Sequence, residues 1–545
     1  MIPQETIAAL GAPSPAKTKT QSMDVLLASK WARLFVPSLS DLFFLAMIGW
    51  LFMGAYGWSG LLADGDVGWH IRTGEYILDN HSVPHTDLYS FSKPGAPWYA
   101  WEWLSDVIDA ALFRVAGLKG VVLPAGILIA LFGTSLIRRI LRYDVNMFVA
   151  IAIAMFGVVS ASVHFLARPH IFTLILLSLS MWMIETDRDG TANPKRIWLL
   201  IPLSMIWTNL HGGFLVLVAV LGLTAAGNAI EALLSEAPLK DKDWQPAIRY
   251  ASLTVGCAAV SLVNPYGWGL HQHVLEYLQS SWIQNVIQEF QSPSFRGENM
   301  KQFEILLFTG LMAAGELIRR RRIAEGLWIL FFAYEALSSA RHVPIFAAVA
   351  VPLIAVAVSG WWKALTGGVS KNSLIGIINK MAAETVQGFR RSSIWPVAAV
   401  IALIFIDAPV KWPKDFPQEL FPTDIIHKHE REIFQSRLLT TDQWGDYLIF
   451  LHPEYKVFVD GRSDFYGPEV GNEYIALTNG SWNWQKLFEK YKFNMVLLPV
   501  ELPAVQLLKQ RSDWHVLADD GKRILLAPRQ NTVAPNRASL VGLRF

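Results

Sequence analysis

The sequence has little cysteine, few charged residues and no excess of either charge sign. It contains one cysteine, Cys257, which excludes internal disulfides, cysteine-type zinc sites, iron–sulfur clusters and covalently attached c-type haem. Charged residues make up 17% of the chain, whereas an average soluble domain carries about 25%. The net charge of +2 provides no electrostatic footprint for nucleic acid, so we expect no nucleic-acid partner.

Apolar residues are abundant instead. Hydrophobic residues account for 52% of the 545 positions, 22 residues are Trp, and the mean hydropathy is +0.32. This composition excludes a disordered chain and a wholly soluble enzyme. It predicts about eleven membrane spans, near residues 40–62, 119–137, 146–163, 170–184, 197–210, 213–233, 249–263, 304–318, 325–340, 343–360 and 393–407. Several of these runs are shorter than the ~20 residues that a span requires, so the boundaries are approximate.

The distribution of Lys and Arg predicts the orientation. These residues are concentrated in the segments that lie inside if the N-terminus is cytoplasmic. Residues 1–35 are then a disordered cytoplasmic tail, residues 36–407 a transmembrane domain with a large first outer loop at 63–118, and residues 408–545 a periplasmic domain. Together these features predict a multi-pass protein of a bacterial inner membrane, in contact with membrane lipids.

Residues 408–545 are charged and rich in turns, and strand-like runs alternate with helix-like ones. Such alternation is typical of a small α/β domain. The candidate strands are residues 437–441, 456–460, 494–500, 515–518 and 523–527. The predicted fold class is therefore a mainly α polytopic membrane protein with a small extracytoplasmic α/β domain.

The string VFVDGRSDFYG in this domain runs from an apparent strand into a turn, where α/β sheets often bind ligands. Asp460, Arg462 and Asp464 could there contact an acceptor or cover a cavity. The alternative is an Asp-Gly turn stabilised by an Arg–Asp ion pair.

Unusual polar and aromatic residues are concentrated in the predicted outer loops. Ionisable groups at the ends of spans are costly in lipid and usually face protein or a water-filled cavity. We therefore expect one polar chamber at the outer face. Its candidate residues are His70, Arg72, His85, Trp98, Tyr99, Trp101, His164, Arg168, His170, Asn209, His211, Asn264, Tyr266, Arg341 and His342.

Each member of this set also has a simpler interpretation. A His at a helix end is often an interfacial residue, Trp and Tyr often form the aromatic belt, and Arg168 could extend to the lipid headgroups. Independent interfacial residues would, however, be scattered over both faces of the membrane. The predicted inner loops are merely basic, so the set as a whole favours the chamber.

Asp64 and Asp66 directly follow the first predicted span. Two carboxylates separated by Gly65 can converge on Mg²⁺ or Mn²⁺ beside phosphate oxygens. One of them could equally act as a general base. A D-x-D string alone is weak evidence, because short Asp-Gly turns are common.

Two amphipathic surface helices are predicted in the first outer loop, at residues 67–79 and 102–116. Glu102 begins the second and is flanked by Trp101 and Trp103. Partial desolvation between two indoles would suit this carboxylate to acid–base catalysis. The alternative is a helix-N-terminal Glu that is favoured by the helix dipole.

The strings DGDVGWHIRTGEYIL, VPHTDLYSFS, WYAWEWLS, RPH, NLHGGF and VFVDGRSDFYG also carry a resemblance. On these motifs the chain resembles the GT-C superfamily of polytopic membrane glycosyltransferases, and in particular a group of bacterial members, over residues 40–270 and 437–530. The resemblance implies a polyprenyl-phosphate- or polyprenyl-diphosphate-linked sugar donor. It also implies that an acidic residue of the first outer loop acts as base or metal ligand, a role that falls on Asp64 or Asp66.

A chemical hypothesis follows. The arginines at 72, 168 and 341 would bind the donor phosphate, and the histidines at 70, 164, 170 and 211 would bind phosphate or sugar hydroxyls. A carboxylate would deprotonate the hydroxyl of a saccharide, lipid or protein acceptor, and one displacement would invert the anomeric centre. Two other functions stay open: a transporter or flippase for a lipid-linked saccharide, and a non-catalytic protein of envelope polysaccharide assembly.

Overall fold

The computed structural model describes residues 34–529, apart from residue 298 and residues 387–391 and 407–409. The predicted cytoplasmic tail therefore lies almost entirely outside the described residues. The chain forms two compact units. The first comprises residues 1–86 and 97–417, and the second comprises residues 87–96 and 418–545. The predicted first outer loop thus contributes a short segment to the C-terminal unit.

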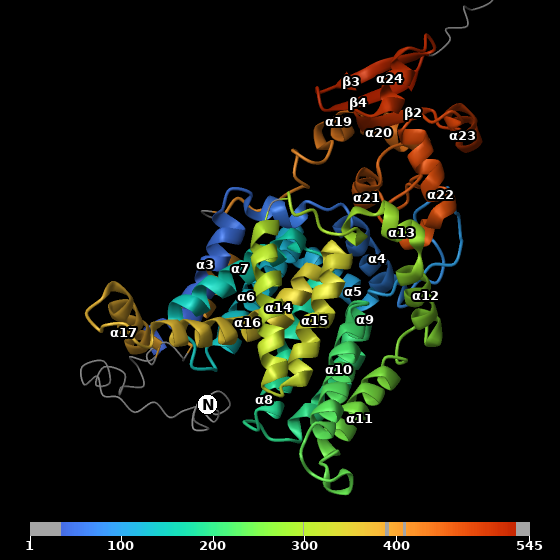
Figure 1. The fold of residues 1–545 in the computed structure, drawn as a ribbon. Coiled ribbons are helices and arrows are strands. Elements are labelled where there is room, and N and C mark those ends of the chain that lie inside the picture. Colours follow the sequence, from blue (N-terminus) through green and yellow to red (C-terminus); the bar gives the residue numbers. More distant parts are fainter. Residues whose placement is uncertain (1–33, 298, 387–391, 407–409, 530–545) are drawn as a thin grey trace, which may run out of the picture. The chain divides into compact units, whose positions relative to one another are not determined.

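The first unit is helical (Figure 1). Helices α6, α7, α14, α15 and α16 pack side by side, α3 packs on α6, and α10 packs on α11. The helices of this unit are α3 (Leu39–Met53), α4 (Val67–Asn80), α5 (Trp103–Ala116), α6 (Leu118–Ile140), α7 (Met147–Ala161), α8 (His170–Arg188), α9 (Leu200–Leu210), α10 (Phe214–Leu233), α11 (Gln245–Val260), α12 (Trp268–Gln279), α13 (Ser281–Val286), α14 (Met300–Arg319), α15 (Ile323–Ser338), α16 (Val343–Thr366), α17 (Leu374–Val386) and α18 (Trp395–Phe405).

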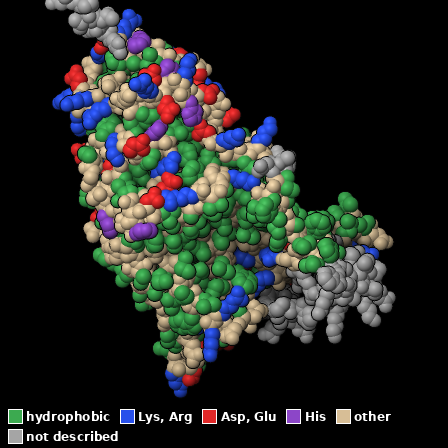
Figure 2. All heavy atoms as spheres, turned by 180° about the vertical axis from the view of Figure 1, so that it is seen from behind, with side chains coloured by type: hydrophobic (Ala, Val, Ile, Leu, Met, Phe, Trp, Pro, Cys, Tyr) green, Lys and Arg blue, Asp and Glu red, His purple; other side chains and the backbone are tan. Residues whose placement is uncertain are grey.

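Each of the predicted spans overlaps one of these helices. Among the described residues, four helical segments are long and apolar enough to cross a membrane: Leu118–Ile140, Met147–His164, Phe214–Leu233 and Ala340–Thr366. Leu39–Met53, Leu374–Ala383 and Trp395–Phe405 are shorter apolar helices. Figure 2 shows hydrophobic side chains over a broad area of the helical unit. A multi-pass membrane protein is thus supported, whereas the number of eleven spans stays a prediction.

The start of α3 is set by a capping box. The Ser38 hydroxyl accepts from the backbone N–H of Asp41 at 3.1 Å, and the Asp41 carboxylate accepts from the N–H of Ser38 at 2.8 Å. The same carboxylate accepts from the N–H of Ser393 at 2.7 Å, so it also anchors the segment before α18. After α3, the 3₁₀ helix Gly57–Leu62 leads the chain to Asp64 and Asp66.

The two helices predicted at residues 67–79 and 102–116 are confirmed, since α4 and α5 lie within one residue of these ranges, whereas their place at the membrane surface stays a prediction. They pack closely because Gly74 has no side chain. A Cβ atom at Gly74 would lie 1.9 Å from the carbonyl oxygen of Asp106 and 2.7 Å from Cβ of Ala110. This close approach brings the side chain of His70, one turn before Gly74, against Asp106.

The second unit contains a four-stranded sheet in the order β1-β2-β4-β3. Strand β1 (Leu438–Leu439) pairs in parallel with β2 (Met495–Pro499), and β4 (Arg523–Pro528) runs antiparallel to both β2 and β3 (Trp514–Asp519). The helices are α19 (Thr423–Lys428), α20 (Glu430–Phe434), α21 (Asp442–Leu451), α22 (Ser463–Thr478), α23 (Trp484–Tyr491) and α24 (Pro503–Lys509). Four of the five predicted strands and the predicted α/β character are therefore confirmed.

The predicted strand at residues 456–460 is wrong. Val457 forms only an isolated parallel bridge with Ser90, in which its N–H and C=O bond to Tyr89 and Phe91 at 2.9 Å. Val457 and Phe458 are buried like strand residues, but their partner is the segment 87–96 rather than the sheet. Asp460 therefore does not lie at the end of a sheet strand.

Candidate functional site

The acidic pair of the first outer loop binds Arg168. Nη1 of Arg168 lies 2.7 Å from Oδ2 of Asp64, and Nη2 lies 2.5 Å from Oδ2 of Asp66. Asp64 also accepts from the N–H of Asp66 at 3.0 Å, which folds the turn, and the N–H of Ala167 donates to the carbonyl of Leu61 at 2.8 Å. Burial alone would lower the pKa of Arg168, but the two carboxylates raise it well above its ordinary value.

A second cluster joins α4, α5 and the segment before α10. Nδ1 of His70 lies 2.6 Å from Oδ1 of Asp106, and Nε2 of His70 lies 3.6 Å from Oε2 of Glu102. His70 and Asp106 are buried. Burial raises the pKa of Asp106 and lowers the pKa of His70, because the charged form of each group is costly away from water. Glu102, 13% exposed, is the more accessible carboxylate.

His211 borders Glu102 from the other side. The N–H of Gly213 donates to Nδ1 of His211 at 2.9 Å, which assigns the ring proton to Nε2. That Nε2 lies 3.3 Å from Oε1 of Glu102. Thr173 contacts Nδ1 at 2.9 Å and accepts from the Trp207 indole. Burial lowers the pKa of His211, so a neutral imidazole faces the carboxylate.

A third cluster surrounds Glu289, which lies in the 3₁₀ helix Gln288–Phe290. Its carboxylate lies 3.5 Å from Nη1 of Arg341 and 4.0 Å from Nδ1 of His164. The His164 and His170 rings are 4.0 Å apart. Burial raises the pKa of Glu289, but Arg341 and then Arg168 lower it, with the net shift downward.

The three clusters form one charged region. Arg168, His211 and His170 all act electrostatically on His70, and Arg168 acts on Glu289. Side chains from distant loops thus lie together in the first unit, whereas a polar chamber lined by them stays a prediction. The roles of its residues stay predictions.

Aromatic predicted residues line a neighbouring part of this region. The Tyr99 ring stacks on His273 at 4.5 Å and lies 5.0 Å from Tyr266, while Trp101 lies 5.1 Å from His273. The Tyr266 hydroxyl accepts from the N–H of Ala100 and donates to the carbonyl of Pro84, each at 2.7 Å. These bonds fasten the first outer loop to the segment before α12.

The other predicted residues of the first unit have structural contacts. Asn209 accepts from the Trp103 indole at 2.9 Å, and Asn264 donates to the carbonyls of Ser261 and Gly267, as a turn residue does. The remaining contacts are those of Arg72 with Glu75 at 2.5 Å, His342 with Glu335 at 3.3 Å, His85 with the Tyr266 ring at 4.8 Å, and Trp98 with the Trp69 ring at 6.0 Å.

In the C-terminal unit, Arg462 forms the Arg–Asp ion pair that the sequence suggested as the alternative to ligand binding. Its Nη2 lies 2.7 Å from Asp460 and 2.8 Å from Asp87, and the Tyr466 hydroxyl donates to Asp460 at 2.7 Å. Arg462 and Asp460 are buried, and Asp464 is half-buried. The cluster attaches the segment 87–96 to this unit. Ligand binding by these three residues stays a prediction.

Asp106 and Glu289 were missed by the sequence analysis. The sequence contained an indication for Asp106. It follows Glu102 by four residues on the predicted helix, so the two side chains lie on the same face of that helix. The sequence contained no such indication for Glu289, because this residue lies in an irregular segment and only the tertiary fold places it between Arg341 and His164.

A divalent metal was predicted at Asp64 and Asp66. Among the described residues, no group of three or more His, Cys, Asp or Glu side chains could hold a metal ion. Two carboxylates can suffice only when substrate oxygens complete the coordination. Here both carboxylates are already bound by Arg168, so the pair does not fit a resident metal.

An apolar groove adjoins Arg168. It has a volume of about 200 Å³ and lies between α5, α6 and α8. Arg168 and Asp109 are its charged lining residues, beside side chains such as Leu112, Leu128 and Phe172. Burial raises the pKa of Asp109 to about 8, so this carboxyl holds its proton at neutral pH.

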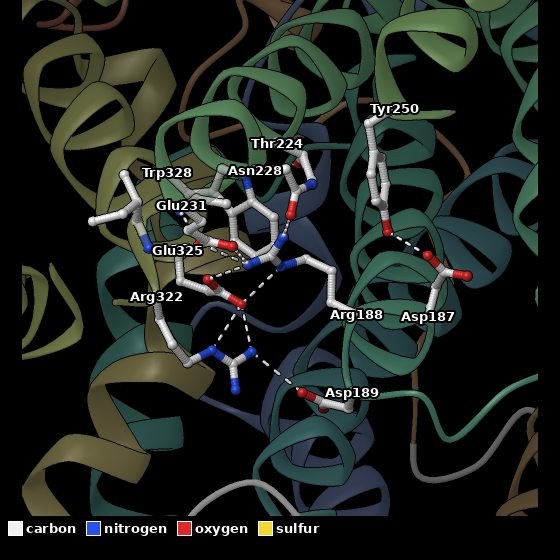
Figure 3. A network of polar contacts seen from close by, with 12 residues as sticks. Asp187, Arg188, Asp189, Thr224, Asn228, Glu231, Tyr250, Arg322, Glu325 and Trp328 are labelled. Atoms are coloured by element: carbon white, nitrogen blue, oxygen red, sulfur yellow. Dashed lines mark hydrogen bonds and ion pairs between the residues drawn. The ribbon is translucent and has the colours of Figure 1, made fainter. Parts of the chain in front are cut away.

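A separate ionic network joins α8, α10 and α15 (Figure 3). Arg188 contacts Glu325 at 2.9 and 3.0 Å, Glu231 at 3.1 Å and Asn228 at 2.5 Å. Arg322 contacts Glu325 and, at 3.2 Å, Asp189. The network lies at the C-terminal end of α8, opposite Arg168, and was not predicted. Because its arginines are matched by carboxylates, it ties helix ends together rather than attracting an ion.

No protein-family model and no curated protein sequence matches the chain. Among solved structures, the chain is similar to the oligosaccharyltransferase AglB of Archaeoglobus fulgidus in complex with an inhibitory peptide and a dolichol-phosphate. The TM-score is 0.55 at 12% sequence identity, over 85% of this chain and 69% of the other. A second structure, of the A. fulgidus oligosaccharyltransferase with Zn and sulfate, has a TM-score of 0.46 at 11% identity, over 85% and 68%. The chain thus shares the fold of the archaeal oligosaccharyltransferase AglB.

Proposed function

We propose that the chain is a membrane glycosyltransferase that transfers a sugar from a polyprenyl-phosphate-linked donor to an acceptor hydroxyl or amide at the outer face of the membrane. The fold supports this class, and the AglB structure of the same fold was solved with a dolichol-phosphate and a peptide. The observation that carries the proposal is the group of contacts in which Arg168 binds Asp64 and Asp66 while Glu102 lies between His70 and His211.

The arginine side chains of this region suit the phosphate group of the donor. Arg168 and Arg341 both act on Glu289, so the two guanidinium groups face the same region. A guanidinium binds phosphate oxygens through two parallel N–H bonds. We assign donor phosphate binding to these two arginines, while Asp64 and Asp66 hold Arg168 in place and reduce the net positive charge around it.

The carboxylates differ in basicity. Asp64 and Asp66 are ion-paired to a guanidinium, which stabilises their charged forms and makes them poor proton acceptors. Glu102 instead faces His70, which contacts Asp106 at 2.6 Å, and the neutral His211. We therefore assign the general base to Glu102, oriented by the two histidines. Asp64 or Asp66 as base remains the alternative from the sequence analysis.

The reaction is a single displacement. The acceptor oxygen or nitrogen gives its proton to the Glu102 carboxylate and forms a bond to the anomeric carbon. The bond from that carbon to the donor phosphate oxygen breaks, and the lipid phosphate leaves with both electrons. Attack from the face opposite the leaving group inverts the anomeric centre. Arg168 and Arg341 stabilise the negative charge that develops on the phosphate.

The test uses the purified full chain in lipid nanodiscs with a radiolabelled polyprenyl-phosphate sugar. Glu102→Gln should lower transfer by about 10²–10⁴-fold, the usual contribution of a general base. The Asp64→Asn and Asp66→Asn variants should weaken donor binding more than turnover. Asp79→Asn is the matched control, because this exposed carboxylate of α4 pairs with Arg114. Full activity in the Glu102 and both Asp variants would refute the proposal.

Transport of the lipid-linked saccharide is the rival function. Alternating access requires the bundle to open at both ends in turn. The ionic network of Arg188, Glu325 and Arg322 joins α8, α10 and α15 at the end opposite Arg168, and opening there would separate buried charges. This favours transfer over transport. A non-catalytic assembly role would be favoured if function survived loss of both aspartates.

A further inference from the structure

A further pocket lies in the C-terminal unit, and none of its lining residues is among the predicted site residues. Its volume is about 410 Å³, within the range of about 300–1,000 Å³ of small-molecule sites. Residues 434–437 between α20 and β1, residues 452–456 after α21, and Phe91 line it. All of them belong to the same compact unit.

Aromatic rings form one wall. The Phe434 ring lies 5.1 Å from Tyr455 at an interplanar angle of 88°, and 4.0 Å from the His452 ring. The Tyr455 hydroxyl donates to the carbonyl of Ser436 at 3.0 Å, which fixes the ring. Phe434 and Tyr455 are half-buried, so part of each ring faces the pocket. The negative face of such a ring attracts the C–H groups of a sugar.

Two cations form another wall. The Arg437 guanidinium lies 4.8 Å from the centre of the Phe91 ring and donates to the carbonyl of Tyr491 at 3.1 Å. The Lys456 ammonium donates to the carbonyl of Leu88. Within the described part of the chain, neither cation forms an ion pair with a carboxylate. These backbone contacts hold the two cations in place and leave their charges uncompensated, which suits an anionic ligand.

His452, which contacts the Phe434 ring, also contacts two carboxylates. Nε2 of His452 lies 2.9 Å from Glu430, and Nδ1 lies 3.1 Å from Glu454. These carboxylates are exposed by half or more and can accept hydrogen bonds from hydroxyl groups. The pocket therefore presents anion-binding groups, aromatic faces and hydroxyl acceptors together.

We propose that this pocket binds an acidic saccharide. A sugar carboxylate binds Arg437 and Lys456, the sugar ring packs on Phe434 and Tyr455, and hydroxyl groups donate to the carboxylates beside His452. An acidic peptide would satisfy the two cations but would supply neither the C–H face nor the cluster of hydroxyls. The inference goes beyond the proposed function and does not depend on it, because binding requires no turnover.

The test is isothermal titration of the full chain in nanodiscs with trigalacturonate. Cellotriose, which has the same number of sugar rings and no carboxylate, and a triglutamate peptide serve as comparison ligands. The Arg437→Gln, Lys456→Gln double variant should weaken trigalacturonate binding by about tenfold or more, since two charge-assisted contacts are lost. Phe434→Ala should weaken it similarly. The Lys509→Gln, Arg511→Gln double variant is the control, because it removes the same two charges elsewhere in this unit.

Thermal unfolding of each variant checks that this unit stays folded, and Arg437→Lys, which keeps the charge, should retain partial binding. The proposal is overturned if trigalacturonate fails to bind the wild-type chain at millimolar concentration, or if cellotriose binds equally well. Tighter binding of triglutamate would overturn it in favour of an acidic-peptide site. Equal losses in the binding and control variants would show non-specific charge attraction and overturn it as well.

Discussion

Nε2 of His211 lies 3.3 Å from Oε1 of Glu102, although the two residues come from different loops of the first unit. Gly213 and Thr173 contact Nδ1 of this imidazole, so its proton is on the nitrogen that faces the carboxylate. A neutral donor in this place orients the carboxylate without cancelling its charge. This contact therefore distinguishes the environment of the Glu102 carboxylate from that of Asp64 and Asp66, whose carboxylates face a guanidinium group.

Replacing His211 should reduce catalysis by misorienting Glu102. We expect His211→Ala to lower kcat by about 10–100-fold, a part of the effect of the base itself, with little change in KM for the donor. The pH–rate profile should move to higher pH, because the carboxylate loses a hydrogen-bond donor to its charged form. His81→Asn is the control, since His81 lies in the left-handed region at φ 52°, which Asn tolerates. An unchanged profile would contradict the orienting role.

Arg168 should make transfer insensitive to metal removal. Its guanidinium already contacts both carboxylates of the acidic pair. We expect a chelator to change the transfer rate by less than about twofold, and Mn²⁺ to leave the melting temperature of the wild-type chain unchanged. In Arg168→Gln the carboxylates lose their cation, so Mn²⁺ should then raise the melting temperature. Loss of wild-type transfer after chelation, with recovery on adding Mg²⁺ or Mn²⁺, would contradict this prediction.

Asp109 should make stability depend on pH. Its pKa is raised by burial to about 8, from an ordinary value of 3.8. The folded state therefore binds this proton more tightly than the unfolded state does. The stabilisation of the folded state that results is fully present below the pKa of the unfolded state, and it is lost as the pH rises through the pKa of the folded state. Asp109→Asn cannot ionise, so its melting temperature should rise relative to the wild type between about pH 4 and about pH 8. A constant difference over this range would show that Asp109 ionises normally.

The ionic network should stabilise the bundle only as a complete set. Glu325 is almost fully buried and is bound by both Arg188 and Arg322. Glu325→Gln should destabilise the folded chain by about 3–5 kcal/mol, because it removes the buried carboxylate that both arginines share, and Glu231 and Asp189 compensate their charges only in part. Removing Arg188 as well, as Arg188→Met, should recover part of the loss.

Thermal unfolding in detergent measures both variants, and Glu316→Gln is the control. Glu316 also pairs with two arginines, Arg319 and Arg320, but at an exposed helix end, where such pairs contribute little. The interpretation fails if Glu325→Gln is no more destabilising than this control, or if the double variant is additive.

Local patterns were sufficient for the elements around the site. The amphipathic periodicity of residues 67–79 and 102–116 predicted α4 and α5 within one residue, because side-chain spacing along a helix is a local property. A local pattern was misleading for residues 456–460, which the strand-like run predicted as a sheet strand. Their apolar run is buried against residues 87–96, and a buried run looks the same whether or not a sheet is its partner.

The sequence by itself determined that apolar helices would form in the first unit and that ionisable residues would be concentrated in the outer loops, since both follow from hydrophobicity and residue order. Only the tertiary structure decided which charges meet: Arg168 with the acidic pair, Glu102 between His70 and His211, and Glu289 beside Arg341. Such pairings depend on how helices from distant segments pack. Coulomb energy acts through space rather than along the chain, so the order of residues alone does not specify them.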